Sequence, residues 1–322
     1  MRGDKVLIIE DAMSLSGAIK SELQETYQIH ADTAANLEQA RELLQKNSGD
    51  YFIATVDLQL PDCNNGDAVT LVNEYQIPAI VFTGQQDPSV RAHFITHDLV
   101  DYVFKTGAYS IHYICALINR VLFNHAFTIL VVDDSRSALL SLEKLLNNQG
   151  FQVIGAKDAA ECMMVMKQKP DMVILDQFLP DGMGHDICRN IRTIYPDPIL
   201  QIIGVSSKGD HDTAAFFLKN GGDDFLLRPF NPEEFVRRIN HRADYVDQIR
   251  ELNNISEEKN KFLGMAAHDL RNPLSVIQHA SKRLSKGELP DDKFQSLLEM
   301  IQKSTSSMQH LLNDLLDISA IE

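Results

Sequence analysis

Acidic, hydroxyl and cationic side chains that together could bind a metal ion and a phosphoryl group occur twice in this sequence, each at the end of a short apolar run. In both sets two adjacent acids come first, and one acid, one hydroxyl and one cation follow at later runs. The first set is Glu10, Asp11, Asp57, Thr83 and Lys105. The second set is Asp133, Asp134, Asp176, Ser206 and Arg228.

Three carboxylates that lie close together repel one another unless a divalent cation bridges them, and a few carboxylates with water suit Mg²⁺. The single acid of the third run, Asp57 or Asp176, is then available as a nucleophile toward phosphorus. The metal, the hydroxyl and the cation would neutralise the phosphoryl oxygens. Acids that merely end strands are the alternative interpretation. The recurrence of five suitable residue types in two sets favours a site.

Most members of the two sets are separated by the same distance along the chain. Asp11 and Asp134 lie 123 residues apart, as do Thr83 and Ser206, and Lys105 and Arg228. A duplicated domain of about 120 residues explains this repeat. We therefore expect domains at residues 1–125 and 126–245, followed by a third segment at residues 246–322.

Short, almost continuously apolar runs alternate with amphipathic stretches in both copies, which predicts parallel sheets covered by helices on both faces. In doubly wound α/β sheets the carboxyl ends of the strands meet in one crevice, so each set should converge there. The expected strands are residues 6–11, 52–57, 79–83 and 101–105 of the first copy and 129–134, 172–176, 202–206 and 224–228 of the second. The expected helices include residues 37–44 and 137–146.

The third segment has a heptad pattern. After Pro232 only Pro273 interrupts a helical pattern before the turn at Gly287–Pro290. A spacing of four and three residues predicts a helical hairpin, and two hairpins pair naturally as a four-helix bundle. We therefore expect a homodimer. The seam residues are Leu263, Ala267, Leu270, Leu274, Ile277, Ser281 and Leu284, then Leu298, Ile301, Thr305, Met308, Leu312 and Leu315.

The motifs around the two acid sets resemble those of receiver domains in two-component response regulators. They are Asp11-Ala-Met-Ser14 and Leu58-Gln-Leu-Pro-Asp62, then Val132-Asp-Asp-Ser135, Leu175-Asp-Gln-Phe-Leu-Pro-Asp-Gly-Met-Gly184 and Arg228-Pro-Phe230. The resemblance implies two five-stranded, flavodoxin-like domains with phospho-acceptors at Asp57 and Asp176. It implies switch hydroxyls at Thr83 and Ser206 and switching aromatics at Tyr102 and Phe225. One Mg²⁺ per receiver would be held by Glu10, Asp11, Asp57 and the main-chain carbonyl of Gln59, or by Asp133, Asp134, Asp176 and that of Phe178.

Both copies depart from this family pattern. The first has Glu10 for the commoner Asp, a longer loop at residues 62–66, and Thr106 where Pro usually follows the Lys. The second has Arg228 in place of that Lys, and a planar guanidinium is a poor substitute for a compact ammonium at a tight phosphate site. We therefore expect weaker switching in the second copy.

Gly221–Phe225 resembles the signature of diguanylate cyclases, but it lies within the repeat and no cyclase-sized domain surrounds it.

The run Phe262–Leu274 resembles the H-box of histidine kinases, and Leu311–Ser319 resembles the end of their second bundle helix. The resemblance implies that His268 is phosphorylated, that Asp269 is the neighbouring general base, and that Asn272 orients water for phosphatase action. The family's ATP-binding domain is expected beyond Glu322, so ATP would act only through a domain outside this chain.

Composition limits the remaining functions. With 30 Lys and Arg against 45 Asp and Glu, the net charge of −15 disfavours binding to nucleic acid or anionic membranes. No apolar run approaches a membrane span or a signal peptide, so we expect a cytoplasmic protein.

The hypothesis is a phosphorelay between His268 and the receiver aspartates in the N-terminal part of a soluble hybrid histidine kinase, with a cognate kinase or response regulator as partner. The alternative is a non-catalytic dimeric scaffold or phosphate sink.

Overall fold

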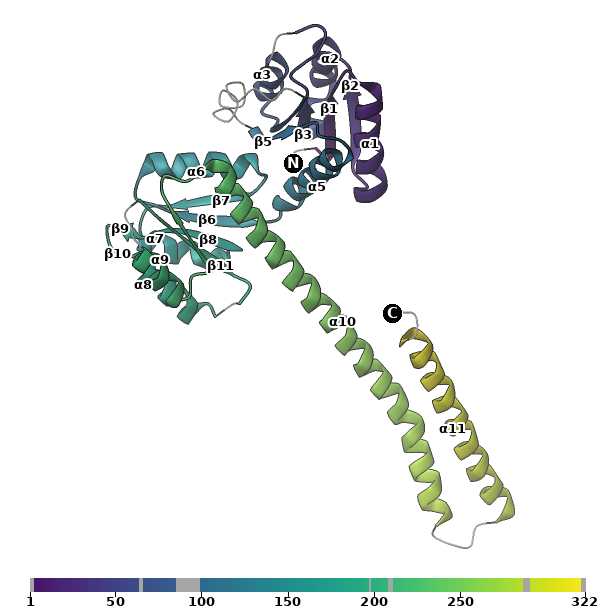
Figure 1. Cartoon of the computed structure of the whole chain (residues 1–322). Coiled ribbons are helices and arrows are strands. Elements are labelled where there is room, and N and C mark those ends of the chain that lie inside the picture. The colour runs from purple at the N-terminus through teal and green to yellow at the C-terminus, as the bar shows by residue number, and fades with distance from the viewer. Residues whose placement is uncertain are drawn as a thin grey trace. The chain divides into compact units, whose positions relative to one another are not determined.

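The computed structural model describes residues 3–63, 66–84, 99–196, 198–207, 211–285 and 290–319 (Figure 1). These residues form two compact units, Met1–Asp247 and Gln248–Glu322. The first unit contains both copies of the repeat. The second contains the hairpin.

The first receiver-like sheet has five parallel strands in the order β2-β1-β3-β4-β5. Alternate residues of β1 point to opposite faces: Val6 and Ile8 pack with α1 and α5, and Leu7 and Ile9 pack with α2 and α3 (Figure 1). Burial on both faces explains why the strand is apolar throughout. The elements are β1 (Lys5–Ile9), α1 (Met13–Tyr27), β2 (His30–Ala34), α2 (Leu37–Asn47), the 3-10 turn η1 (Ser48–Asp50), β3 (Tyr51–Val56), α3 (Asp67–Glu74), β4 (Ala79–Thr83), β5 (Leu99–Phe104) and α5 (Ala108–Asn124).

The second sheet repeats this topology with strand order β12-β11-β8-β6-β7, all parallel. The two predicted five-stranded parallel sheets are therefore confirmed. A short antiparallel pair, β9 with β10, follows β8. The elements are β6 (Thr128–Val132), α6 (Arg136–Asn148), β7 (Gln152–Ala156), α7 (Ala159–Val165), η2 (Met166–Gln168), β8 (Met172–Asp176), β9 (Phe178–Leu179), β10 (Gly182–Met183), α8 (Gly184–Ile194), β11 (Gln201–Ser206), α9 (His211–Lys219) and β12 (Asp224–Leu227).

Helix α10 (Pro232–Leu284) begins in the second sheet's domain and continues into the second unit as one helix of 53 residues. Its first turns complete the core of that domain, because Phe235, Ile239, Ala243 and Val246 are fully buried there. The helical pattern predicted after Pro232 is thus one helix that joins the second copy to the hairpin.

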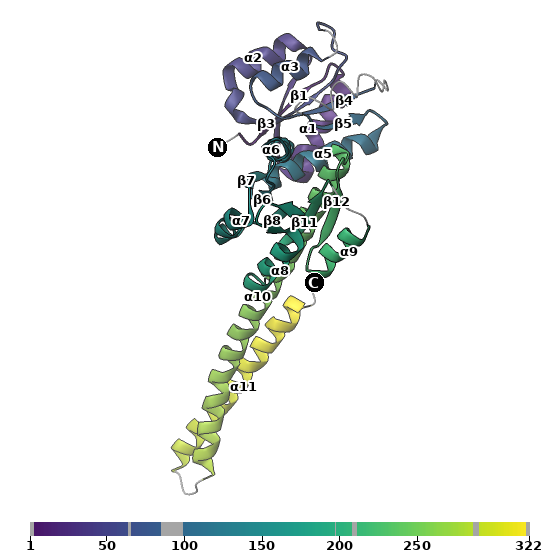
Figure 2. The ribbon, with the colours of Figure 1, turned by 90° about the vertical axis from the view of Figure 1, so that its left-hand side faces the viewer.

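The C-terminal part of α10 and helix α11 (Asp291–Ser319) run antiparallel as a hairpin (Figures 1 and 2). The predicted turn at Gly287–Pro290 falls mostly on residues 286–289, outside the described residues. Pro273 lies inside α10, as expected. In a single chain the predicted heptad seam is open: Leu263 and Leu274 are exposed, and Leu270 and Ile277 are half-buried. The open seam leaves apolar surface for a second hairpin to cover.

Candidate functional site

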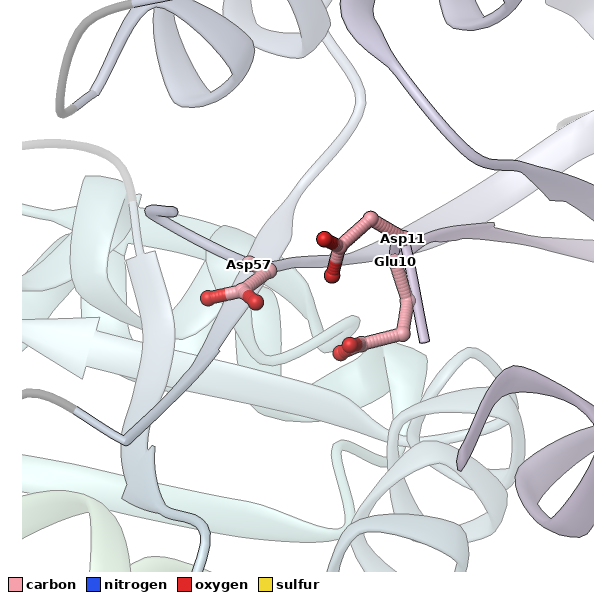
Figure 3. Close-up of side chains that lie close together, drawn as sticks. All are labelled: Glu10, Asp11 and Asp57. Atoms are coloured by element: carbon pink, nitrogen blue, oxygen red, sulfur yellow. The ribbon is translucent and has the colours of Figure 1, made fainter. Parts of the chain in front are cut away.

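The first acid set converges at the carboxyl edge of its sheet. Glu10 and Asp11 follow β1 and Asp57 follows the neighbouring strand β3, and their carboxylates lie within 4.8 Å of one another (Figure 3). Glu10 and Asp57 are buried, and Asp11 is exposed. Thr83 is fully buried at the end of β4. The topology therefore places these four residues as the sequence predicts.

Lys105 follows β5 and connects two of the acids. Its Nζ lies 2.6 Å from Asp57 Oδ2 and 2.7 Å from Glu10 Oε2. Burial alone would lower the pKa of Lys105, but the hydrogen bonds to Asp57 and Glu10 outweigh burial and raise it. Burial raises the pKa of Glu10, and the bond from Lys105 partly offsets this effect. The ammonium is therefore charged and fixed beside the predicted acceptor.

Main-chain amides orient the same carboxylates in both copies. The N–H of Gln59 donates to Asp57 Oδ1 at 3.1 Å, and the N–H of Phe178 donates to Asp176 Oδ2 at 3.0 Å. The carbonyls of Gln59 and Phe178, predicted as metal ligands, therefore belong to residues that also hold the acceptor side chain.

The donor set of the first site suits a hard divalent cation. Three carboxylates converge on one ammonium, so two negative charges would stay unbalanced when all four groups are ionised. Mg²⁺ binds such carboxylate oxygens and retains several waters, which the exposed position of Asp11 permits. Glu10, Asp11 and Asp57 therefore fit the predicted ion.

The second set occupies the same strand ends with different contacts. Asp133 and Asp176 are buried at the ends of β6 and β8, Ser206 is fully buried at the end of β11, and Asp134 is exposed. Arg228 Nη2 lies 2.7 Å from Asp133 Oδ2, whereas its Nη1 is 3.9 Å from Asp176 Oδ1. The cation thus binds the predicted metal ligand more closely than the predicted acceptor. Among the described residues, only the first set brings three acids within 4.8 Å.

The pKa of Asp176, the acceptor candidate of the second set, is raised. Burial raises its pKa from 3.8 to about 6, and the charge of Asp133 adds to this shift while the Phe178 amide and Arg228 oppose it. The second site therefore carries an acid that ionises only near neutral pH when no metal is present.

The predicted switching aromatics lie at corresponding places with different burial. Tyr102 of β5 is buried, with its ring centroid 5.4 Å from that of Phe104. Phe225 of β12 is half-buried, with its centroid 5.4 Å from that of Phe217. The Gly221–Phe225 run leads into β12, which begins at Asp224, so it forms part of the receiver-like sheet.

The candidate phosphohistidine is exposed on α10. His268 Nδ1 lies 3.2 Å from Asp269 Oδ1, and its side chain is 71% exposed. Asn272 is exposed one turn later, immediately before Pro273. Because a carboxylate only accepts hydrogen bonds, Asp269 favours the tautomer with the proton on Nδ1 and leaves Nε2 free to attack phosphorus.

Two acids that the sequence analysis did not single out support the loops after the acceptors. Asp62 accepts hydrogen bonds from the N–H groups of Leu37 and Glu38 at 2.9 and 3.1 Å. Asp181 does the same for Ala159 and Ala160 at 2.9 and 3.2 Å. The bond from Leu37 is the main cause of the lowered pKa of Asp62. The signal was present in both copies, since each acid ends a Leu-Pro-Asp sequence.

The response regulator receiver domain matches residues 6–111 and 129–240, and the His Kinase A (phospho-acceptor) domain matches residues 258–322. The chain belongs to the response regulator receiver family. It carries two receiver domains followed by a histidine kinase phospho-acceptor domain. The Gly221–Phe225 run lies inside the second receiver match.

Curated relatives match through the receivers. The chain is 34% identical over 128 residues to the probable transcriptional regulator ycf27 of Porphyridium aerugineum, covering 39% of this chain and 52% of that protein. It is 29% identical over 165 residues to the DNA-binding response regulator MtrA of Mycobacterium leprae, covering 51% of this chain and 68% of that protein.

A crystal structure described as a putative two-component system response regulator/GGDEF domain protein is 31% identical to this chain. It aligns with a TM-score of 0.68 over 76% of this chain and 99% of its own. That share exceeds the length of either receiver, so the alignment includes both receivers together.

Within the residues that the structure covers, every helix is too short or too polar to cross a membrane.

The raised pKa of Asp176 predicts how stability depends on pH. Its folded-state pKa of about 6 exceeds the ordinary 3.8, so protonation favours the folded state. This contribution is complete at pH values below the ordinary pKa and is lost as pH rises through the folded-state pKa. Without divalent metal, Asp176→Asn should therefore raise the free energy of unfolding of the second receiver by about 1–3 kcal/mol near pH 8 and have little effect near pH 4.

Urea-dependent hydrogen exchange at β8 would measure this stability at each pH. Asp186→Asn is the matched control, because Asp186 is a neighbouring acid whose side chain is 47% exposed. A gain for Asp176→Asn that is the same at both pH values would contradict the assignment.

The contacts of Arg228 predict the effect of restoring lysine. In Arg228→Lys the compact ammonium should reach Asp176 as Lys105 reaches Asp57. In an Asp57→Ala background, which leaves only the second acceptor, beryllofluoride should then alter hydrogen exchange of β12 at a several-fold lower Mg²⁺ concentration. Identical Mg²⁺ titrations for both proteins would show that the arginine is merely tolerated.

Proposed function

We propose that this chain acts in a phosphorelay in which phosphoryl groups pass between His268 and the receiver aspartates Asp57 and Asp176. Receiver domains and a phospho-acceptor domain in one chain support a role in two-component signalling. The observation that carries the transfer chemistry is the position of Asp57, buried beside two other acids and bonded to Lys105.

In the transfer to the first receiver, an oxygen of Asp57 attacks the phosphorus of phosphorylated His268. The phosphorus–Nε2 bond breaks as the new phosphorus–oxygen bond forms, and the bonding electron pair stays on the imidazole nitrogen. Lys105 and Thr83 supply hydrogen-bond donors for the phosphoryl oxygens. Mg²⁺, held by Glu10, Asp11, Asp57 and the carbonyl of Gln59, supplies charge neutralisation when bound. In the second receiver, Asp133, Asp134, Asp176 and the carbonyl of Phe178 have this role, with Ser206 and Arg228 as donors.

In the proposed domain arrangement, the receivers occupy residues 1–125 and 126–245 and the dimerisation and phosphotransfer domain occupies residues 246–322. The first boundary agrees with the end of α5 at Asn124 and the start of β6 at Thr128. The second boundary lies within α10, so we propose it as a functional division within a continuous helix.

The partners follow from the same proposal. His Kinase A domains typically dimerise, and we propose that two copies of this chain pair through the apolar seam of the hairpin. ATP would enter through an ATP-binding domain that is not part of residues 1–322. The net charge of −15 disfavours nucleic acid as a partner, and we propose that the protein works in the cytoplasm with another kinase or response regulator.

Phospho-acceptor assignment is testable with a small phosphodonor and Mg²⁺. The protein should gain phosphoryl mass at Asp57, and to a lesser extent at Asp176, because Lys105 contacts Asp57 directly whereas Arg228 contacts Asp133. Intact-mass spectrometry of Asp57→Ala, Asp176→Ala and the double variant assigns the sites, with Asp186→Ala as the control. Undiminished labelling of the double variant would refute both assignments.

The role of His268 is tested by supplying an ATP-binding domain of a histidine kinase together with radiolabelled ATP. The parent chain should be labelled on histidine, because Asp269 leaves Nε2 free to attack. His268→Gln should lose the label, whereas His279→Gln, which changes another exposed histidine of α10, should keep it. Equal labelling of His268→Gln and parent would refute the assignment, and no labelling of either protein would favour the non-catalytic scaffold.

A further inference from the structure

A buried polar network joins the two receivers within the unit Met1–Asp247. Asn124, the last residue of α5, is fully buried, and its Nδ2 donates to the main-chain oxygen of Gln149 at 2.8 Å and to Asn240 Oδ1 at 3.1 Å. Asn240 belongs to α10 and Gln149 follows α6, so the network connects the first receiver's last helix to two elements of the second receiver.

Gln149 extends this network to a strand of the first receiver. Its side chain is almost fully buried, and Nε2 donates to the carbonyl of Val100 in β5 at 2.8 Å. Its Oε1 also accepts a long bond from Asn240 Nδ2 at 3.4 Å. One side chain of the second receiver thus contacts both β5 and α10.

Arg120 of α5 adds an ionic clamp to the same junction. Nη1 lies 2.9 Å from Asp244 Oδ1 and 2.7 Å from Asp247 Oδ2, both on α10. Nε donates to Asn124 Oδ1 at 2.7 Å, and the guanidinium lies over the Phe127 ring. The Arg120 side chain is only 13% exposed, whereas its partners Asp244 and Asp247 are 52% and 42% exposed, so only the arginine side of the clamp is shielded from solvent.

The phosphorylation site lies at the other end of β5. Lys105 follows this strand directly and is bonded to Asp57, and Val100 near its start is bonded to Gln149. When a phosphoryl group takes the Lys105 ammonium from Asp57, a displacement of β5 reaches Gln149 through one strand. The buried side-chain amides of Asn124 and Gln149 would lose their hydrogen-bond partners if the two receivers slid past each other. A displacement of β5 therefore either moves the whole junction together or breaks these hydrogen bonds.

We infer that Asn124, Gln149 and Arg120 are positioning residues that transmit the phosphorylation state of the first receiver to α10, the helix that carries His268. The inference rests on the proposed function, because it requires Asp57 to be an acceptor. It goes further by giving the first receiver a direct connection to α10 that does not pass through the second receiver's acid site.

Hydrogen-exchange mass spectrometry on the full-length Asp176→Ala chain tests the inference, because only the first receiver then responds to beryllofluoride and Mg²⁺. Adding them should change the exchange of residues 99–107, which report on β5, and of residues 236–250, which report on α10. In Asn124→Ala the β5 response should remain, while the α10 response should fall by about two- to thirtyfold, the range that measured couplings span.

A second variant removes the ion pairs of Arg120 by changing their exposed acidic partners on α10. Asp244 and Asp247 are 52% and 42% exposed, so Asp244→Asn with Asp247→Asn should fold even if Asn124→Ala does not, and it should also reduce the α10 response. The control is Arg189→Ala, which removes an arginine–aspartate pair on α8, away from the junction, and should leave both responses unchanged.

The outcomes separate the two levels of the proposal. A β5 response without an α10 response in the Asp176→Ala chain, or an α10 response that persists at full size in both junction variants, would overturn the coupling and leave Asp57 as an acceptor. If β5 itself does not respond, Asp57 is not an acceptor, and the proposed function of the first receiver fails together with the coupling.

Discussion

Repulsion among carboxylates held at one edge of a parallel sheet is the constraint on which the rest of this molecule depends. The topology forces Glu10, Asp11 and Asp57 together, and one ammonium from the neighbouring edge of the sheet offsets part of their charge. A further cation at this site would offset the remaining negative charge. In the proposed function, a phosphoryl group on Asp57 would change the contacts of Lys105, which follows β5. The side chain of Lys105 thereby links the proposed phosphorylation of Asp57 to the position of β5.

The two receivers show how one residue can change that balance while the fold stays the same. Both sheets have the same strand order, and each proposed acceptor accepts a hydrogen bond from the amide two residues later. Lys105 contacts both Asp57 and Glu10, whereas Arg228 contacts Asp133 closely and Asp176 only at 3.9 Å. The longer, planar cation thus leaves the buried Asp176 less neutralised, which agrees with its raised pKa. Duplication has produced two sites of similar shape and different electrostatics.

Much of the fold and the site could be predicted from the sequence because the informative residues lie at strand ends and recur at a fixed interval. Apolar runs buried on both faces reveal strands such as β1 and β8, and the heptad spacing reveals α10 and α11. The orientation of long side chains could not be predicted in this way. Nothing in the spacing shows that Arg228 turns toward Asp133, or that Asp62 accepts from the amides of α2. The junction of Asn124, Gln149 and Asn240 likewise joins residues far apart in sequence whose neighbours carry no motif.

The continuity of α10 limits how this protein can change in length. The same helix packs Val246 in the core of the second receiver and displays His268 to solvent. Each residue inserted between them turns everything after the insertion by about 100° around the helix axis, because an α-helix has 3.6 residues per turn. Insertions or deletions of seven residues nearly restore the original facing, and single-residue changes do not. Natural relatives and engineered chimaeras that exchange the receivers while keeping His268 functional should therefore differ in this segment by whole heptads.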